Sequence, residues 1–338
     1  MNKIAAVLSL FVVFALASCG SKRQVPDVSK IKVSLQVQRF DRDFFTIDTN
    51  HTEAALDKLQ QLYPEFMPDF LYNILALPPQ KDSVLQKVKQ FIHDYKPVYD
   101  SVQKVFPDIK NAEQSLHLAL QLTHHYFPGY KIPARIICFT GPIEGYGNVL
   151  TSSGFAVGLQ LYLGKQFSLY QTDYIREVYP DYQARRFEAP YIPVNCVRNL
   201  IEDMFPANTA GKTLMEQMIE NGKRLYVMDQ LLPYTADSLK TGYTQAQLDA
   251  CYKNEATIWN FFLQNDLLYN ADPVVIRDYV TDGPKTNAFG DQSPGNLSQF
   301  SGWQIVKKWM AKNEGKSLEE LMRTPARQLF EETRYKPR

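Results

Sequence analysis

The spacing of hydrophobic residues after the first 30 positions predicts one strand followed by three helices. Apolar and polar residues alternate from Ile31 to Phe40, which is typical of a strand with one buried face. Beyond it, apolar residues recur every three or four positions, as on the buried side of a helix. This period predicts helices over residues 52–77, 82–105 and 111–126, the first of them interrupted by prolines.

The pattern changes near residue 135 and later becomes helical again. Two short apolar runs, at residues 135–140 and 155–164, predict a pair of strands, with a glycine-rich loop over residues 141–148 between them. Helical spacing then returns for most of the remaining chain. It predicts helices over residues 191–204, 213–231, 244–265, 272–280, 298–313 and 317–333.

Three of these helices carry a signal for where they begin. A Ser or Thr followed three residues later by Glu or Gln forms a capping box, which satisfies two backbone N–H groups at a helix start. The pairs are Thr213 with Glu216, Thr244 with Gln247, and Ser317 with Glu320. The connections are short and no repeat is evident, so we expect an α+β fold, a predominantly helical single domain over residues 31–338 with a small sheet. A split near residue 130 is the alternative.

The N-terminus has the pattern of a lipoprotein signal. Lys3 precedes an apolar run from Ile4 to Ala17, which is too short to span a bilayer comfortably. A small residue directly before Cys19 is typical of a bacterial lipobox. We therefore expect a signal peptide over residues 1–18, a lipid on Cys19 and a tether over residues 19–30; an ordinary cleaved signal is the alternative. No acidic run follows Cys19, which favours a periplasm-facing protein on either the inner or the outer membrane.

Composition narrows the classes of function. The 37 Lys and Arg residues nearly balance the 36 Asp and Glu residues, and 45% of the chain is hydrophobic. A nucleic-acid-binding protein that relies on a basic face would need a large excess of Lys and Arg, so we expect no nucleic-acid partner. The 20 Tyr and 20 Phe residues suit contact surfaces, because a tyrosine ring is apolar on its face and polar at its tip.

The usual catalytic and cofactor motifs are missing from the sequence. The Ala210–Thr213 segment resembles a phosphate loop, but Pro206 stands where the first glycine is required. All five histidines lie within the first 125 residues, and none belongs to a His-Glu-x-x-His motif. No serine has the surroundings of a nucleophile. We therefore expect no metal, no cofactor and no enzymatic activity.

Three cysteines remain in the body of the chain: Cys138, Cys196 and Cys251. An odd number cannot all pair within one chain, and their spacing fits no zinc motif. We expect them to act as small buried hydrophobic residues. One disulfide plus a free thiol is the alternative.

The predicted helix 191–204 carries the most notable polar residues. Arg198 and Glu202 are four positions apart, so they can meet on one face as an ion pair or line a groove. Asp203 lies about 100° further around the helix, so the two carboxylates cannot act as a facing acid and base.

Several blocks of the sequence resemble one known family. They are Leu62–Phe66, Gly154–Gly164, Pro190–Pro193 with Arg198–Leu200, Gly222–Tyr226, Asn254–Phe262, Asn265–Tyr269, Gly283–Thr286 and Gly302–Val306. Together with the lipobox, these blocks resemble the gliding motility-associated lipoprotein family GldB of the Bacteroidetes, over nearly the whole mature chain. The resemblance implies a role in gliding motility and in the associated type IX secretion machinery. It implies no biochemical activity.

A second, more distant likeness is to zinc-dependent peptidases with a His-Glu-x-x-His helix. The order of sheet, central helix and helical C-terminal half is similar to theirs, but helix 191–204 has no histidine to hold zinc. The likeness implies a zincin-like scaffold whose degenerate cleft binds a partner. The residues expected to line it are Arg198, Glu202, Tyr243 and Trp303, with Asp203 beside them.

Two main hypotheses of function follow. The first is a non-catalytic envelope lipoprotein, held to a membrane by the lipid on Cys19, that supports gliding or secretion through contacts with other envelope proteins. The second is a hydrolase of peptides or glycans that uses carboxylates without a metal. A carrier of a small ligand in the degenerate cleft is a third reading.

Overall fold

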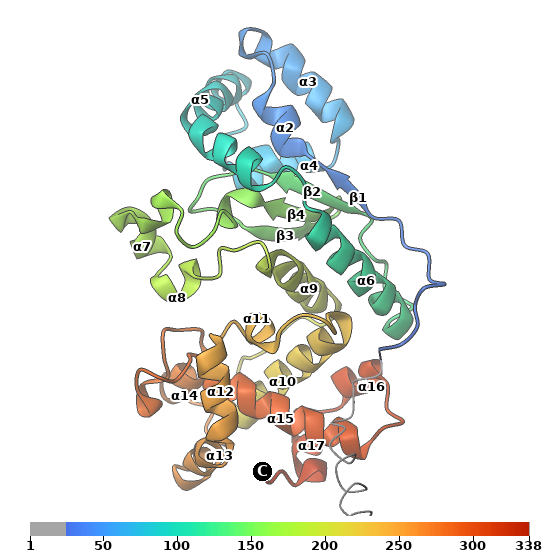
Figure 1. Cartoon of the computed structure of the whole chain (residues 1–338), viewed down its shortest axis with the longest axis vertical. Helices are drawn as coiled ribbons and strands as arrows, with labels where there is room; N and C mark the ends of the chain where they lie inside the picture. Colours follow the sequence, from blue (N-terminus) through green and yellow to red (C-terminus); the bar gives the residue numbers. More distant parts are fainter. Residues whose placement is uncertain (1–24, 338) are drawn as a thin grey trace, which may run out of the picture.

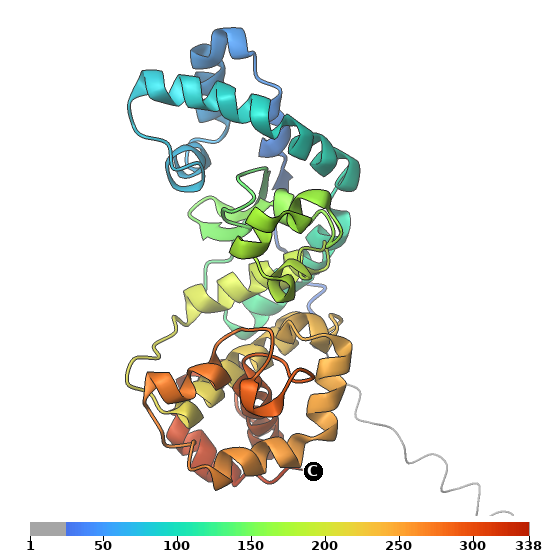
Figure 2. The same cartoon turned by 90° about the vertical axis from the view of Figure 1, so that its left-hand side faces the viewer.

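The computed structural model describes residues 25–337 (Figure 1). The predicted signal peptide, the lipidation site Cys19 and the tether residues before Val25 lie outside the described residues. The described chain is mostly helical and contains one four-stranded sheet, so the predicted α+β class is confirmed. The sheet lies between the N-terminal helices and the C-terminal helices in both views (Figures 1 and 2).

The sheet has the strand order β1-β2-β4-β3, with β1 at Gln36–Gln38, β2 at Arg135–Phe139, β4 at Gly154–Gly158 and β3 at Asn148–Thr151. The first three strands are parallel, and β3 runs antiparallel to β4 at the edge. Three predictions need correction here. The strand over residues 31–40 shortens to β1, the strand over residues 155–164 ends at Gly158 in a 3₁₀ turn, and β3 occupies residues expected to form no strand.

Side chains of the sheet alternate between two cores, as the pleat requires. Ile137, Phe139 and Ala156 pack against the N-terminal helices. On that side lie α2 (Phe40–Phe45), α3 (Thr52–Leu62), α4 (Phe66–Pro68), a π-helical turn (Asp69–Ile74) and α5 (Lys81–Val105), with a short 3₁₀ turn at Thr49–His51. The predicted helix over residues 52–77 is therefore interrupted after Leu62, next to Pro64, because proline cannot donate to a helical hydrogen bond.

The opposite face of the sheet packs against α6 (Lys110–Tyr126) and α9 (Tyr191–Met204). Between β4 and α9 the chain forms 3₁₀ turns at Leu159–Leu161 and Ser168–Gln171, then α7 (Asp173–Val178) and α8 (Asp181–Ala184). α9 matches its predicted bounds. One of its faces is buried against the core, which leaves a row of polar residues on the other.

The C-terminal half is helical. Its helices are α10 (Leu214–Leu231), α11 (Asp237–Thr241), α12 (Gln245–Lys253), α13 (Glu255–Gln264), α14 (Pro273–Val280), α15 (Leu297–Lys312), α16 (Leu318–Arg323) and α17 (Ala326–Thr333), with a 3₁₀ turn at Asn287–Phe289. All three capping boxes are confirmed, at the starts of α10, α12 and α16. Two long predicted helices divide in two: the first at Asn254, between α12 and α13, and the second at Thr324, before Pro325.

Two glycines allow α10 and α15 to cross in backbone contact. A Cβ at Gly302 would lie 1.8 Å from the carbonyl oxygen of Met218, and one at Gly222 would lie 2.3 Å from the backbone of Gly302. No other residue type fits at this crossing, because the neighbouring atoms belong to the main chain. One contiguous core extends from the sheet through these helices to Leu329 in α17, which ties the two halves into one body.

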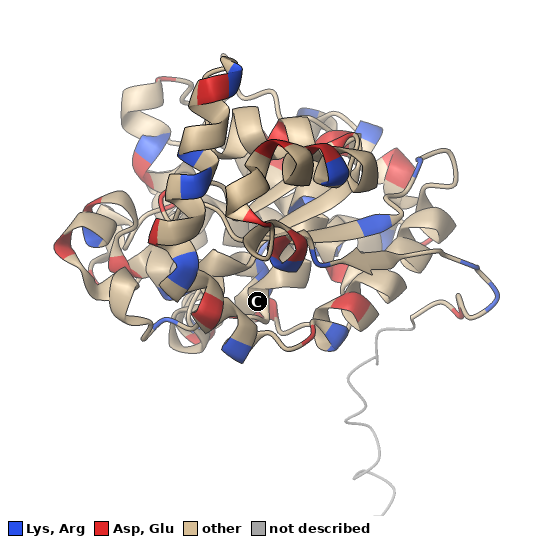
Figure 3. Cartoon of the chain, turned by 90° about the horizontal axis from the view of Figure 1, so that it is seen from above, with Lys and Arg blue, Asp and Glu red and all other residues tan. Residues whose placement is uncertain are grey.

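Basic and acidic positions are interspersed along the elements seen in Figure 3. Within residues 25–337, no helix is both long enough and apolar enough to cross a bilayer.

Candidate functional site

A cleft of about 350 Å³ opens between the edge of the sheet, α9 and the loop that follows α14. Its walls come from the turn at Gly145–Asn148, from α8 and the residues after it, from α9 and from the loop that follows α14. The segments are distant in sequence but meet where the helical C-terminal half joins the sheet. The cleft is therefore a product of the tertiary fold.

One face of α9 supplies the polar wall of this cleft. Asn195, Arg198 and Asn199 stand at positions i, i+3 and i+4, which places them side by side on a helix. The Asn195 amide donates to the hydroxyl of Tyr162 (2.8 Å), and the Asn199 amide donates to the carbonyl of Asn148 (3.1 Å). Tyr162 in turn donates to the side chain of Asn148. These bonds fix α9 against β3.

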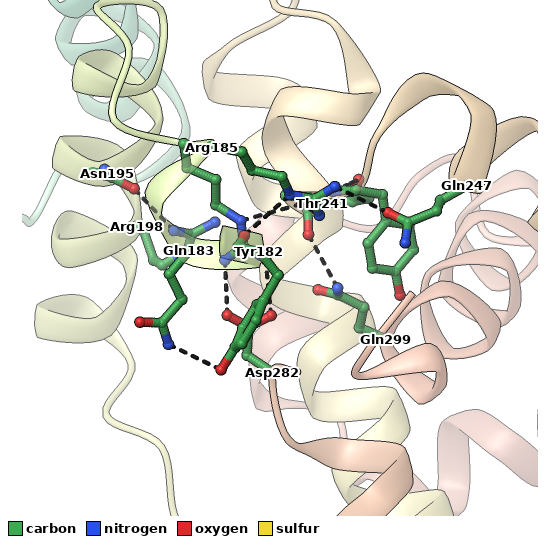
Figure 4. Close-up of polar contacts among 12 residues, drawn as sticks. Tyr182, Gln183, Arg185, Asn195, Arg198, Thr241, Gln247, Asp282 and Gln299 are labelled. Atoms are coloured by element: carbon green, nitrogen blue, oxygen red, sulfur yellow. Dashed lines mark hydrogen bonds and ion pairs between the residues drawn. The ribbon is translucent and has the colours of Figure 1, made fainter. Parts of the chain in front are cut away.

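Arg198 is the principal cation of the α9 face. Its Nη1 donates to Asn195 Oδ1 (3.0 Å) and its Nη2 to the carbonyl of Lys240 (3.3 Å), as Figure 4 shows in part. The side chain is exposed where it borders the cleft. Desolvation by the surrounding protein lowers the pKa of Arg198, and the nearby positive charge of Arg186 lowers it further.

The predicted ion pair between Arg198 and Glu202 is wrong. Glu202 instead lies 3.6 Å from the Nε of Arg224 on α10, and it accepts a hydrogen bond from the backbone N–H of Ala207 (2.7 Å). Arg198 turns toward α11 because the Lys240 carbonyl and the Asn195 amide offer it acceptors there. Helical spacing allows Arg198 and Glu202 to pair, but contacts with other elements determine which partner each side chain takes.

Three arginines converge on the C-terminal end of α11. Arg185 Nη2 (2.8 Å) and Arg186 Nε (3.2 Å) both donate to the carbonyl of Gly242, next to the bond from Arg198 to Lys240. Unsatisfied carbonyls and the negative end of the helix dipole attract cations to such an end. Arg186 also makes a bidentate pair with Asp282, at 2.8 and 2.9 Å.

Arg198 also borders a second cleft, of about 210 Å³, between α9, α10 and the start of α15. Glu202 and Arg224 lie there, together with Asn296 and Gln299 at the start of α15. Arg198 is thus shared by both cavities.

The structure brings together only two of the five residues that the sequence suggested for a cleft. Arg198 and Glu202 both line the second cleft, and Arg198 also lines the first. Asp203 is exposed and accepts from the hydroxyl of Tyr130 (2.5 Å). Tyr243 is buried and donates to the carbonyl of Asn296 (2.8 Å). Trp303 is fully buried in the core, where its Nε1 donates to Asp229 (2.7 Å), so it faces no cleft wall.

The sequence analysis missed Arg186, Asp282 and the asparagines of the cleft. A signal existed for Asn195 and Asn199, because they flank Arg198 on the polar side of a helix that is otherwise apolar. No sequence signal could pair Arg186 with Asp282, which is 96 positions further along the chain.

The three cysteines of the body are free and buried, as predicted. Cys196 lies behind the polar wall and accepts from the Asn148 amide (3.1 Å). Burial raises the pKa of Cys196 to about 12, so its thiol stays protonated at neutral pH and is a poor nucleophile. Among residues 25–337, no three His, Cys, Asp or Glu side chains lie together as metal ligands would.

These features define a mostly helical α+β protein with a cleft whose lining carries a net positive charge. The chain belongs to the gliding motility protein GldB family, whose family model matches residues 21–337. The family resemblance of the sequence is therefore confirmed, and with it a role in gliding motility. Comparisons with curated proteins and with solved structures gave no significant match. The zinc-peptidase likeness stays a prediction.

Proposed function

We propose that this chain is a non-catalytic envelope lipoprotein that faces the periplasm and supports gliding and type IX secretion through protein contacts. Its family membership supports the gliding role. The proposed anchor is a lipid on Cys19, before the described body of the protein.

The non-catalytic part of this proposal rests on the chemistry of the cleft of about 350 Å³ that Arg198 lines. Its hydroxyls belong to Tyr162 and Tyr179, whose pKa values are both raised by burial, and the nearest thiol is the protonated Cys196. Its carboxylate, Asp282, is engaged by both Nη atoms of Arg186. General acid–base or nucleophilic catalysis needs a group poised to exchange a proton near neutral pH. The cleft instead offers amides and a guanidinium, which are suited to binding.

A separate groove of about 530 Å³ supplies a surface for protein contacts. It runs between the α5–α6 connection, the start of α9 and the loop before α11. Apolar and proline side chains line it, and Tyr234 at its edge is 80% exposed. Exposed tyrosines next to apolar grooves are typical of protein interfaces.

A photo-crosslinking amino acid at position 234 in cells of the native host tests the contact role. We expect crosslinks to components of the gliding or secretion machinery. The same crosslinker at Lys253, an exposed polar position on α12, is the matched control and should capture much less. Capture of none of these components at position 234, together with cleavage of peptides or glycans by the purified protein, would contradict the proposal.

The lipid anchor has its own test. Cells fed labelled palmitate should incorporate label into the wild-type protein but not into Cys19→Ala. Label in the Cys19→Ala variant would place the anchor elsewhere.

A further inference from the structure

We propose that the cleft around Arg198 binds a ligand through a single carboxylate, with Arg198 as its anchor and the apolar wall beside it holding an adjoining apolar group. This inference goes beyond the envelope role and does not depend on it, because the purified protein can test it.

The first support is the charge of the cleft. The charged residues of its lining are Arg186, Arg198 and Asp282, two cations and one anion. Asp282 neutralises Arg186 through two hydrogen bonds. No carboxylate within residues 25–337 forms an ion pair with Arg198, whose nearest carboxylate on its own helix pairs with Arg224 instead. The lining therefore keeps a net charge of one positive unit at Arg198.

The second support is the set of donors that Arg198 retains. A guanidinium carries N–H groups on three nitrogens in a rigid fork. The bonds to Asn195 and Lys240 fix the plane of the fork but use one N–H of Nη1 and one of Nη2. The remaining donors are available to an anion in the cleft. A guanidinium already oriented by the protein loses little entropy when it binds a carboxylate.

The net charge favours a carboxylate over a phosphate. A carboxylate monoanion would neutralise the cleft, whereas a dianionic phosphate would leave an excess negative charge in partly desolvated surroundings. The lining also holds Leu161, Tyr179 and Phe187, which suit an apolar group attached to the acid. Both a free small acid and the C-terminus of a protein carry this chemistry.

Calorimetry on the purified full chain in detergent tests the proposal. The probes are N-acetylphenylalanine, its uncharged amide, and a tripeptide with a C-terminal phenylalanine. We expect the acid to bind about tenfold tighter than the amide or more, as one charge-assisted hydrogen bond provides. A tripeptide that binds much tighter than the single acid would identify a protein C-terminus as the source, and equal binding would identify a small acid. Either result supports the carboxylate site.

Three variants complete the test. Arg198→Gln should abolish the preference for the acid. Asn195→Asp should do the same with the arginine still present, because it places a competing carboxylate beside Arg198. Arg176→Gln on α7 removes an equal charge at an exposed site and should leave binding unchanged. Equal binding of acid and amide to the wild type, or a preference that survives both Arg198→Gln and Asn195→Asp, would overturn the proposal.

Discussion

The ammonium of Lys240 lies 2.5 Å from Asp229 Oδ1, and both side chains are only 1% exposed. The pair connects α11 to α10, while Trp303 of α15 donates to the second oxygen of Asp229. Asp237 also lies 2.7 Å from the same ammonium. The backbone carbonyl of Lys240 accepts a hydrogen bond from Arg198. This buried cluster therefore fixes the position of a group that holds Arg198 in the cleft.

We expect Lys240→Met to destabilise the protein strongly. Removal of one partner from a buried ion pair typically costs about 3–5 kcal/mol, because the other charge stays buried without its counter-ion. The measurement is the free energy of unfolding in denaturant. Lys316→Met removes an exposed lysine that pairs with Glu320 and is the matched control; it should change the midpoint little. Equal effects of the two substitutions would contradict this account.

The glycine crossing of α10 and α15 gives a second prediction. Gly302→Ala should destabilise by about 3 kcal/mol or more, because its methyl group would collide with a main-chain carbonyl that cannot turn aside. Gly315→Ala is the control, since a Cβ there meets nothing within 4 Å. Thermal unfolding of both variants measures the difference. Wild-type stability of Gly302→Ala would show that the helices do not cross in backbone contact.

Local signals in the sequence predicted the helix starts well. Thr213, Thr244 and Ser317 begin their helices as expected, because a capping box acts within four residues. The breaks at Asn254 and Thr324 were harder to foresee, since the apolar spacing continues through them. β3 was missed because Asn148–Thr151 becomes a strand only by pairing with β4. Pairing of this kind depends on tertiary structure.

The buried cysteines predict a loss of stability at alkaline pH. Burial raises the pKa of both Cys196 and Cys251 from 9.0 to about 12. Below pH 9 each thiol is protonated in both the folded and the unfolded chain, so it does not change the free energy of unfolding. Between pH 9 and 12 only the unfolded chain loses the proton, so stability falls by about 1.4 kcal/mol per pH unit per thiol.

Unfolding free energies of the wild type and of Cys196→Ala/Cys251→Ala, measured across this range, test the prediction. The decline should begin near pH 9 in the wild type. In the variant the decline between pH 9 and 10 should be shallower, because only the buried Cys138 contributes there, and the buried tyrosines add to it from about pH 10 for the same reason. The same pH profile in both proteins would show that the thiols are not buried as described.

Asp282 should oppose the binding of an acid to the cleft. Asp282→Asn removes the carboxylate of the lining, so the acid probe should bind about threefold tighter, as expected for the loss of one nearby like charge. Asp291→Asn is the control, because that carboxylate is 84% exposed and pairs with Lys285. Titration calorimetry at low and high salt measures both. Weaker binding to Asp282→Asn would show that Asp282 holds Arg186 in place for the ligand.

The cleft could be predicted only in part from the sequence. The sequence could suggest Arg198 for a cleft because it is a charge on the polar face of a helix whose other face is apolar, and in the structure it lines two cavities. Its partner could not be foreseen, since the Lys240 carbonyl is 42 residues away in sequence. Trp303 was expected to line a cleft. In the structure its indole N–H donates to the buried carboxylate of Asp229, so the whole side chain can be buried in the core.

The claim that this protein acts through contacts and not through carboxylate catalysis has one direct test. The double variant Glu202→Gln/Asp203→Asn, placed at the native locus, removes both negative charges of α9, and the amides can still accept the bonds from Ala207 and Tyr130. The measurement is gliding or type IX secretion by the host, with the abundance of the variant checked in the same cells. We predict wild-type function. Loss of function at wild-type abundance would contradict the account and favour a hydrolase.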